Sequence, residues 1–584
     1  METVIKTIPV HLCQYIATQD YDLYTHTDHS VWRYIMKISQ YYFQHKAHSK
    51  YLDGLNETGI STERIPKISE MDERLQKFGW RAVPITGFVP PAIFLEMLSL
   101  GILPIACDMR KLENIEYTPS PDIVHEAAGH APIIADPSYA SFLRRFGSLA
   151  RKVIFAKEDC VVYEAILNLS ETKEDPESSE EDIKKAQENL DEAYKTVGYV
   201  SEAQQAARLG WWSLEYGLIK EGGEFKIYGA GLLSSIGESY TCLGDEVKKI
   251  PLTIDCIKQD YDITKPQPQL FYAESFKEME SVIDDLAATM AYTNPSTESL
   301  DKAIRAETVT TTELSSGLQV GGQLVKYRVH EGLVSYLHFT GPTQLAENNK
   351  EIPGQGPLYH KEGFGTPLGK IESYDKGLDH FSFDELEKEG LLEGNSVKIK
   401  YQSGVLIEGR LIKITRFSGL NQIFSFEDCT VSLGSEVLFD PSWGTFDMAC
   451  STEAAEVFGG APDRASYLSQ VEEMTLKAKP HKTNLTEDNK AFSDLLGRLR
   501  NLRESNDITE SQLVELHQDS LSVDPKNWLA RWEILELSEI LALDSLSDRL
   551  ESELKNLAEE DSSVYDLVHR GLRLFGRGNL SPLQ

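Results

Sequence analysis

Residues 121–130 read PDIVHEAAGH, and this stretch decides how the N-terminal half of the chain is interpreted. It contains His125 and His130, and no other histidine occurs between positions 50 and 329. Zinc proteases commonly carry two histidines four residues apart on one helical face, but here the spacing is five. On an ideal α-helix five residues advance about 500°, so the two side chains would point about 140° apart. The spacing therefore predicts that one histidine lies at a helix end, and Gly129 is a residue typical of such an end.

A third metal ligand has to come from elsewhere in the chain. Glu215 lies in the run WWSLEYG at 211–217, where an ionised carboxylate among apolar side chains needs a partner such as a metal ion. Two histidines and one carboxylate are the ligand set of non-haem iron(II) oxygenases, although imidazole also binds zinc and copper. Taken alone, the residues are equally compatible with exposed, non-binding positions. They also fit a zinc hydrolase that uses His125, His130 and Glu126, although the five-residue spacing argues against it.

The composition limits the partners and the compartment. The chain has 584 residues, and its formal net charge of −34 argues against nucleic acids and anionic membrane surfaces. Its length suits about two to four globular domains. No apolar run approaches the roughly 20 residues that span a bilayer, and the N-terminus lacks a signal-peptide pattern. Seven scattered cysteines form neither a disulfide framework nor a C-x-x-C site, so we predict a cytoplasmic protein.

Residues 1–305 are predicted to form one mainly α-helical domain with minor β structure. Apolar residues recur at spacings of three and four in 31–36 and 91–98, and the prolines at 90 and 91 suit a helix start. Residues from about 171 to 195 are dense in Glu, Asp and Lys, which predicts an exposed charged helix or a solvated insertion.

The amino-acid composition and residue pattern of the chain change after about residue 306. Residues 306–455 are predicted to form a small β-rich domain, with a hairpin of 397–401 and 405–414 around a glycine-containing loop. Residues 456–584 are predicted to be helical. There Asp524 and Pro525 are expected to start a helix with an apolar stripe of Trp528, Leu529, Trp532, Leu535 and Leu537. The sequence gives these extensions no function. A non-catalytic binding or assembly protein, or a homo-oligomer built through them, stays open.

Three segments in the same order, 117–130, 211–217 and 228–238, resemble the pterin-dependent aromatic amino acid hydroxylases. The resemblance runs from about His29 to Tyr292 and does not cover roughly the last half of the chain. It implies a catalytic domain that uses Fe(II), a tetrahydropterin such as tetrahydrobiopterin, and dioxygen to hydroxylate a small aromatic amino acid. The likeness is strongest to members that convert L-phenylalanine to L-tyrosine. The same chemistry on tyrosine or tryptophan is the alternative.

The resemblance also implies roles for individual residues. The iron ligands would be His125, His130 and Glu215. The substrate-binding residues would be Arg110, Tyr117, Thr118, Asp122, Trp211, Gly231 and Ser234, with Arg110 on the substrate carboxylate and Asp122 holding that arginine. The pterin-binding residues would be Val89, Phe94 and Glu126, with Phe94 stacked on the pteridine ring.

The chain departs from the family pattern at several of these places. Pro90 and Pro91 replace the serines common in the pterin loop, and Ala92 replaces a common arginine. Gly210 stands where an aromatic residue usually precedes the tryptophan, and residues 291–295 replace an arginine-proline-phenylalanine segment. These changes bear on pterin affinity and substrate choice and leave the iron ligands in place. The run GAGLLS at 229–234 resembles a phosphate loop but lacks its third glycine.

Overall fold

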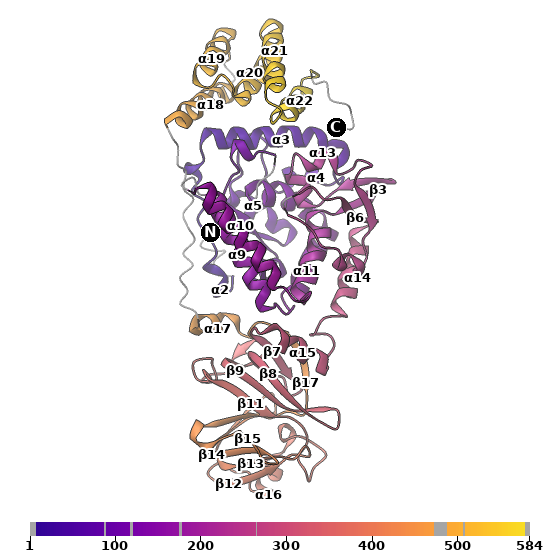
Figure 1. Cartoon of the computed structure of the whole chain (residues 1–584), viewed down its shortest axis with the longest axis vertical. Coiled ribbons are helices and arrows are strands. Elements are labelled where there is room, and N and C mark those ends of the chain that lie inside the picture. Colours follow the sequence, from indigo (N-terminus) through magenta and orange to yellow (C-terminus); the bar gives the residue numbers. More distant parts are fainter. Residues whose placement is uncertain are drawn as a thin grey trace.

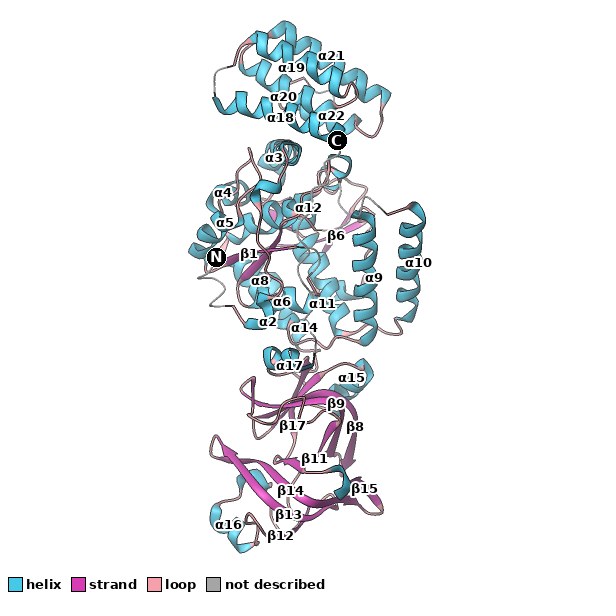
Figure 2. Cartoon of the chain, turned by 90° about the vertical axis from the view of Figure 1, so that its left-hand side faces the viewer, coloured by secondary structure: helices cyan, strands magenta, loops and turns pink. Residues whose placement is uncertain are grey.

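The computed structural model describes residues 8–86, 89–116, 121–174, 178–263, 265–471, 487–505 and 508–577. Three parts follow one another along the long axis of the molecule (Figures 1 and 2). The N-terminal region, residues 8–306, lies in the middle. The β-rich region, residues 310–459, lies at one end, and the C-terminal helical region, residues 487–577, lies at the other.

The N-terminal region is mainly helical. Its α-helices are α2 (Val10–Cys13), α3 (His26–Lys46), α4 (Tyr51–Glu57), α5 (Ile68–Leu75), α6 (Pro91–Ser99), α7 (Ala131–Ile134), α8 (Pro137–Ala150), α9 (Lys157–Glu174), α10 (Glu180–Thr196), α11 (Glu202–Gly210), α12 (Ala230–Ser234), α13 (Glu238–Thr241), α14 (Phe276–Ala287) and α15 (Thr297–Ala306). Short 3₁₀ turns include η3 (Leu112–Asn114) and η6 (Ile254–Lys258). As the sequence predicts, α6 begins at Pro91, in the first helical position.

Two small sheets complete this region. Strands β1 (Arg81–Ile85) and β2 (Ile102–Ala106) form a parallel pair. Strands β3 (Leu218–Glu221), β4 (Glu224–Ile227), β5 (Lys248–Pro251) and β6 (Gln269–Ala273) form a second sheet in the order β4-β3-β6-β5. The helices cover these sheets, so the minor β structure lies within a helical domain.

The charged segment predicted at about 171–195 falls in a pair of adjacent helices, α9 and α10 (Figure 2). Ser179 starts α10 with a capping box, in which its hydroxyl accepts from the Asp182 backbone and the Asp182 carboxylate accepts from the Ser179 backbone. Leu169, Ala186 and Leu190 form a small core between the helices. The outer faces carry the charges, as expected for a solvated helix.

The β-rich region holds two antiparallel sheets. The first contains β7 (Thr310–Leu314), β8 (Leu318–His330), β9 (Leu333–Glu347), β10 (Lys350–Glu351), β11 (Gly363–Pro367) and β17 (Ala454–Gly459). The second contains β12 (Ser396–Lys400), β13 (Val405–Phe417), β14 (Leu420–Leu433), β15 (Glu436–Phe439) and β16 (Phe446–Ala449). The pairing of β12 with β13 confirms the predicted hairpin. Helix α16 (Phe383–Lys388) packs beside the second sheet, and α17 (Arg464–Val471) follows β17.

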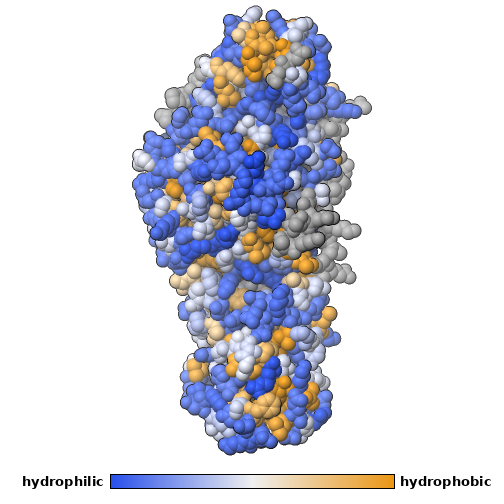
Figure 3. Space-filling model, turned by 180° about the vertical axis from the view of Figure 1, so that it is seen from behind, coloured by the Kyte–Doolittle hydropathy of each residue, from blue (hydrophilic) through white to orange (hydrophobic). Residues whose placement is uncertain are grey.

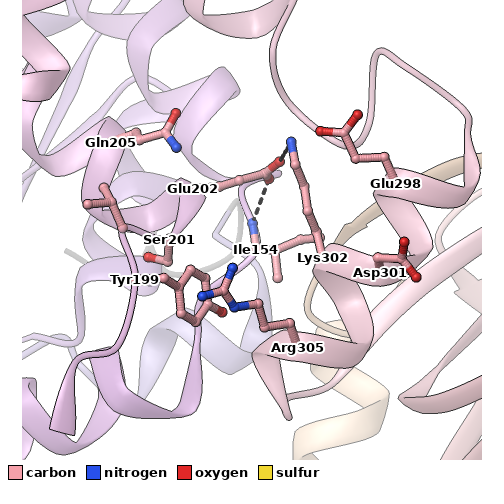
Figure 4. Close-up of a pocket in the computed structure, with 10 residues that line it drawn as sticks. Ile154, Tyr199, Ser201, Glu202, Gln205, Glu298, Asp301, Lys302 and Arg305 are labelled. Carbon is pink, nitrogen blue, oxygen red and sulfur yellow. Dashed lines mark hydrogen bonds and ion pairs between the residues drawn. The ribbon is translucent and has the colours of Figure 1, made fainter.

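Helix α15 joins the N-terminal region to the β-rich region. Figure 4 shows Glu202 of α11 pointing toward Lys302 of α15, and Arg305 lying over the ring of Tyr199. The Glu202 carboxylate accepts from Lys302 Nζ at 3.0 Å and from the Ala291 backbone at 2.7 Å. These groups line a cavity of about 280 Å³. These contacts connect α11, which Trp211 follows directly, to α15, which precedes the β-rich region.

A buried ionic cluster forms a second junction between these regions. Arg464 of α17 donates from Nη1 to Glu96 Oε2 of α6 at 3.0 Å. His11 Nε2 lies 3.2 Å from the same carboxylate, and Arg151 lies 3.6 Å from its other oxygen. Burial disfavours the charge on Glu96, but the adjacent His11 imidazole and the charge of Arg464 outweigh burial and lower its pKa to about 2.

The C-terminal helical region contains α18 (Glu487–Ser505), α19 (Glu510–Val523), α20 (Trp528–Ile540), α21 (Asp544–Glu560) and α22 (Tyr565–Arg573). The prediction that Asp524 and Pro525 begin a helix is wrong. Asp524 ends α19, and α20 starts at Trp528 because the Asn527 side chain accepts from the Leu529 backbone. The predicted apolar stripe is buried.

This C-terminal region shares one hydrophobic core with the N-terminal region. Trp528 and Trp532 of α20 lie edge-on to Tyr34 of α3, with ring centroids 4.6 and 4.8 Å apart. Arg33 of α3 pairs with Glu536 of α20. The long helix α3 is therefore buried by the N-terminal domain on one side and by the C-terminal helices on the other.

The surface seen from behind is mostly hydrophilic, with a hydrophobic area at the end formed by the C-terminal helices (Figure 3). Within the described ranges, no helix has the length and apolar character needed to cross a membrane. All seven cysteines lie in the described ranges, and none of them forms a disulfide.

Candidate metal and substrate site

The two histidines lie on a π-helix, η4 (Val124–His130), that continues directly into α7. A π-helix joins each residue to the fifth one along, so side chains five apart fall on the same face. His125 is the second residue of η4 and so lies at the start of the helix, but Gly129 does not mark a helix end, because the chain continues through His130 into α7. The wider helical turn brings His125 and His130 together, with ring centroids 5.2 Å apart.

Gly129 has a different reason to be glycine. A Cβ atom at this position would lie 2.8 Å from the Ala230 carbonyl oxygen and 2.9 Å from the Ala230 Cβ. The absence of a side chain lets the π-helix lie directly against α12. That contact brings Ser234, at the far end of α12, next to the first histidine.

The third candidate ligand lies on a second π-helix, η5 (Trp211–Glu215). Its carboxylate reaches both histidines: His125 Nε2 lies 3.2 Å from Oε2, and His130 Nε2 lies 3.2 Å from Oε1. The three ligand atoms all lie within 4.8 Å of one another. Among the residues that the structure describes, no other group of three or more His, Cys, Asp or Glu side chains meets this description.

The far nitrogens of both imidazoles face hydroxyl groups. His125 Nδ1 lies 3.1 Å from Ser234 Oγ, and that hydroxyl donates its own hydrogen to the Ala230 carbonyl at 2.8 Å. Ser234 Oγ is therefore placed to accept from His125 Nδ1–H, and in the neutral imidazole that a metal would bind, this leaves the lone pair on Nε2. His130 Nδ1 lies 3.4 Å from the Tyr139 hydroxyl, a longer contact.

The electrostatics of the three side chains suit a cation. Burial disfavours a charged His125, but the neighbouring Glu215 carboxylate outweighs burial and raises the pKa of His125 to about 9. Burial likewise opposes ionisation of Glu215, yet His130 and His125 hold its pKa well below the usual range. His130 Nε2 is buried and makes no hydrogen bond. An ionised carboxylate between two imidazoles, with this nitrogen unpaired, fits a divalent metal of the non-haem iron type.

Arg110 and Asp122, two of the predicted substrate residues, form a buried pair beside the histidines. Arg110 donates from Nε and Nη2 to the two Asp122 oxygens, both at 2.8 Å. Its Nη1 donates to the Ser234 carbonyl at 3.0 Å and, at 3.4 Å, to the Ile115 carbonyl. Asp122 also accepts from the His125 backbone at 3.2 Å. The pair therefore fixes Arg110 relative to the candidate metal ligands, and Asp122 makes the contact with Arg110 that its predicted role requires.

Trp211 lies at the start of η5, and two tyrosine rings stack on it. Tyr216 is stacked on it at 4.5 Å and Tyr261 at 4.3 Å. Tyr261 was not predicted, since nothing in its spacing, 50 residues from Trp211, points to this contact. Gly210 has no aromatic ring, and the Phe146 ring of α8 occupies the space beside it, 2.9 Å from where a Cβ of residue 210 would lie.

The candidate pterin residues lie on neighbouring elements. Phe94 is half-buried on α6, and Val89 packs just before that helix against a small cluster around Ile93 and Met97. Helix α6 contacts β2, and β2 contacts the π-helix of the histidines. Glu126 is buried, burial raises its pKa to about 8, and its Oε2 has no hydrogen-bond partner. An unpaired buried carboxyl oxygen fits a ligand that donates hydrogen bonds.

The remaining predicted substrate residues divide into two groups. Gly231 and Ser234 lie on α12, against the π-helices. Tyr117 and Thr118 lie outside the described residues. The structure thus brings the three ligand candidates, Arg110, Asp122 and Ser234 into one continuous set of contacts.

Comparison with known proteins gives a consistent picture. Residues 13–157 and 186–314 match the model of the biopterin-dependent aromatic amino acid hydroxylase family, and the unmatched residues 158–185 fall in the α9–α10 pair. Phenylalanine-4-hydroxylase of Pseudomonas aeruginosa is 28% identical over 272 residues, which cover 46% of this chain and 87% of that protein. Phenylalanine-4-hydroxylase of Bos taurus is 30% identical over 234 residues, which cover 40% of this chain and 42% of that protein. A crystal structure of Chromobacterium violaceum phenylalanine hydroxylase with bound oxidised Fe(III) is 23% identical, covers 47% of this chain and 84% of that chain, and gives a TM-score of 0.37.

Proposed function

Over residues 13–157 and 186–314 this chain belongs to the biopterin-dependent aromatic amino acid hydroxylases, and from that premise we propose that it is a phenylalanine 4-monooxygenase. It converts L-phenylalanine to L-tyrosine with dioxygen, Fe(II) and a tetrahydropterin. One observation carries the proposal: two π-helices direct His125, His130 and Glu215 to a common point. The ligand set is that of non-haem iron oxygenases.

The chain's own residues prepare the iron site. Bound Fe(II) and the tetrahydropterin supply the electrons that activate dioxygen. His125 and His130 present Nε2, and Glu215 presents one oxygen to each imidazole. Ser234 sets the tautomer of His125, and the Tyr139 hydroxyl faces the other imidazole. These contacts hold the ligands in place before the metal arrives, which reduces the cost of ordering them.

Arg110 holds the substrate carboxylate in this proposal. Asp122 accepts from Nε and from one Nη2 hydrogen, and the Ser234 and Ile115 carbonyls accept from Nη1, so the second Nη2 hydrogen is the one left for the substrate carboxylate. Arg110 is 5% exposed, and a charge-assisted hydrogen bond is strong in such surroundings. Two tyrosine rings already stack on Trp211, so we expect the substrate ring to contact an edge of the indole.

The pterin contacts are proposed for Phe94, Val89 and Glu126. The half-buried Phe94 ring supplies a surface for stacking. Glu126 accepts a hydrogen bond from the pterin, directly or through a water molecule, at its unpaired oxygen. A cytoplasmic location and oligomerisation through the C-terminal regions remain predictions.

Purified protein loaded with Fe(II) tests the proposal. It would be supplied with oxygen and tetrahydrobiopterin and offered labelled phenylalanine, tyrosine and tryptophan together, and the products would be resolved by mass. Labelled tyrosine formed from phenylalanine, and lost when either iron or pterin is omitted, is the expected result. The variant His130→Ala should abolish it, while Lys184→Ala on the exposed face of α10 should not.

The other outcomes separate the alternatives. Hydroxylation of tryptophan or tyrosine would retain the mechanism and change the substrate. Zinc in the purified protein together with hydrolytic activity would replace the proposal with a metal hydrolase.

A further inference from the structure

Arg570 of α22 reaches from the C-terminal helical region into the N-terminal domain. It is 5% exposed. Its Nη1 donates to the Ile236 carbonyl at 2.8 Å and to Glu116 Oε1 at 3.2 Å. Its guanidinium lies over the ring of Tyr240, with the carbon 4.4 Å from the ring centroid. One side chain thus joins two segments that lie about 120 residues apart in the sequence.

The same two segments hold Arg110. Arg110 Nη1 donates to the carbonyls of Ser234 and Ile115, each one or two residues from the groups that Arg570 binds. The segments 115–116 and 234–236 are therefore bridged twice, by Arg110 from the substrate side and by Arg570 from the C-terminal side. A shift of either segment would move the acceptors of Arg110.

The 112–116 segment packs against the C-terminal helices over only part of its surface, with Ile115 in the shared core. A cavity of about 540 Å³ lies between them, lined on one side by residues 112–116 and on the other by residues that include Trp528 and Leu567. Across an open space of this size few dispersion contacts form. The hydrogen bond of Arg570 to Glu116 is a polar tie between this segment and α22.

Helix α22 itself is firmly placed. The Tyr34 hydroxyl donates to the Leu567 carbonyl. A Cβ atom at Gly571 would lie 2.7 Å from Trp532 Nε1, so α22 packs closely on α20. Arg570 therefore extends from a rigid support.

We propose that Arg570 is a positioning residue for the amino acid substrate. Through Ile236 and Glu116 it holds the two segments that orient Arg110, so the C-terminal helical region forms part of the substrate site. This inference rests on the proposed function. It gives the C-terminal region a role in substrate affinity, separate from pterin binding on α6.

The test compares Arg570→Met and Arg570→Lys with wild type in the full-length, Fe(II)-loaded protein. Loss of charge-assisted hydrogen bonds should raise KM for L-phenylalanine about 10-fold in Arg570→Met, with KM for tetrahydrobiopterin within about 2-fold of wild type. Arg570→Lys keeps the charge, so its KM for L-phenylalanine should lie between those of wild type and Arg570→Met. Isothermal titration with L-phenylalanine should show the same weakening as a direct change in Kd.

Arg577→Met is the matched control. Arg577 also forms several ion pairs, with Glu539, Asp548 and Glu551, but all of them lie within the C-terminal helical region. The variant Arg577→Met should leave KM for L-phenylalanine and KM for tetrahydrobiopterin unchanged. If Arg570→Met does not fold, Arg570→Lys carries the comparison.

Two results would overturn the inference. One is an unchanged KM and Kd for L-phenylalanine in a folded Arg570 variant. The other is an equal effect of the Arg570 and Arg577 variants on kcat and thermal midpoint with no change in KM, since that would show only a stabilising role. Failure of the proposed function would appear differently, as no hydroxylation by wild type. The L-phenylalanine isotherms would then decide the role of Arg570 alone.

Discussion

Replacing Ser234 with alanine should weaken iron binding without removing a ligand. The Ser234 hydroxyl accepts from His125 Nδ1–H at 3.1 Å and is held by the Ala230 carbonyl at 2.8 Å. In Ser234→Ala the imidazole loses the partner that fixes its tautomer and ring orientation. Removing such a partner typically costs about 10–100-fold in metal affinity, or about 1.4–2.7 kcal/mol. Tyr139→Phe removes a contact of 3.4 Å from the other histidine, so its effect should be smaller.

Fe(II) affinity would be measured anaerobically by competition with a chelator of known affinity. Ser235→Ala is the matched control, because its hydroxyl is also buried but accepts from the Glu238 backbone, away from the ligands. Its Kd for iron should equal that of wild type. The tautomer argument would be refuted if Ser234→Ala bound iron as tightly as Ser235→Ala, or if Tyr139→Phe had the larger effect.

Three further perturbations test other parts of the structure. Arg110→Lys should raise KM for L-phenylalanine by about 10–100-fold, since lysine cannot pair with Asp122 and also bind the substrate. Steady-state kinetics would measure this change. An unchanged KM would contradict the proposal that Arg110 binds the substrate carboxylate. Glu96 contributes roughly 3 kcal/mol while ionised, because its pKa is lowered from 4.5 to about 2. This contribution is complete above about pH 4.5 and is lost as the pH falls toward 2. The difference in thermal midpoint between wild type and Glu96→Gln should therefore shrink as the pH is lowered from about 5 to about 3. A constant difference over this range would contradict the proposed contribution of Glu96. Trp532→Ala should lower the free energy of unfolding by about 3–5 kcal/mol, because the ring is buried against Tyr34. Circular dichroism during denaturant unfolding would measure this loss. A loss below about 1 kcal/mol would contradict a core shared by the N-terminal and C-terminal regions.

The parts of the fold that follow from local chemistry could be predicted from the sequence. Alternating apolar residues around a short glycine-containing loop gave the hairpin of β12 and β13. Proline at 91 gave the start of α6. The start of α20 could not be predicted in the same way. Asp524 and Asn527 are both good caps, and only the packing of the helices decides which one is used.

The candidate ligands could be predicted, but the backbone that joins them could not. The spacing of five is incompatible with one face of an α-helix, and local patterns do not reveal a π-helix because its residues are those of an ordinary helix. The contact of Gly129 with Ala230 shows what supports the wider turn: a neighbouring helix, 101 positions along the chain, packed against the backbone. Tyr261 and Phe146 were missed for the same reason, since each reaches Trp211 or Gly210 only through the tertiary fold.

The two extensions contact the catalytic region at opposite ends, and each contact reaches an element of the candidate site. At one end Arg464 pairs with Glu96 on α6, the helix that carries Phe94. At the other end Arg570 binds the segments that hold Arg110. One link involves the buried Glu96 carboxylate and the other the buried Arg570 guanidinium, and a buried charge left without its partner is costly, so neither extension can separate freely from the catalytic region. Removing the β-rich region should therefore weaken pterin binding more than amino acid binding. Removing the C-terminal helices should weaken amino acid binding more than pterin binding.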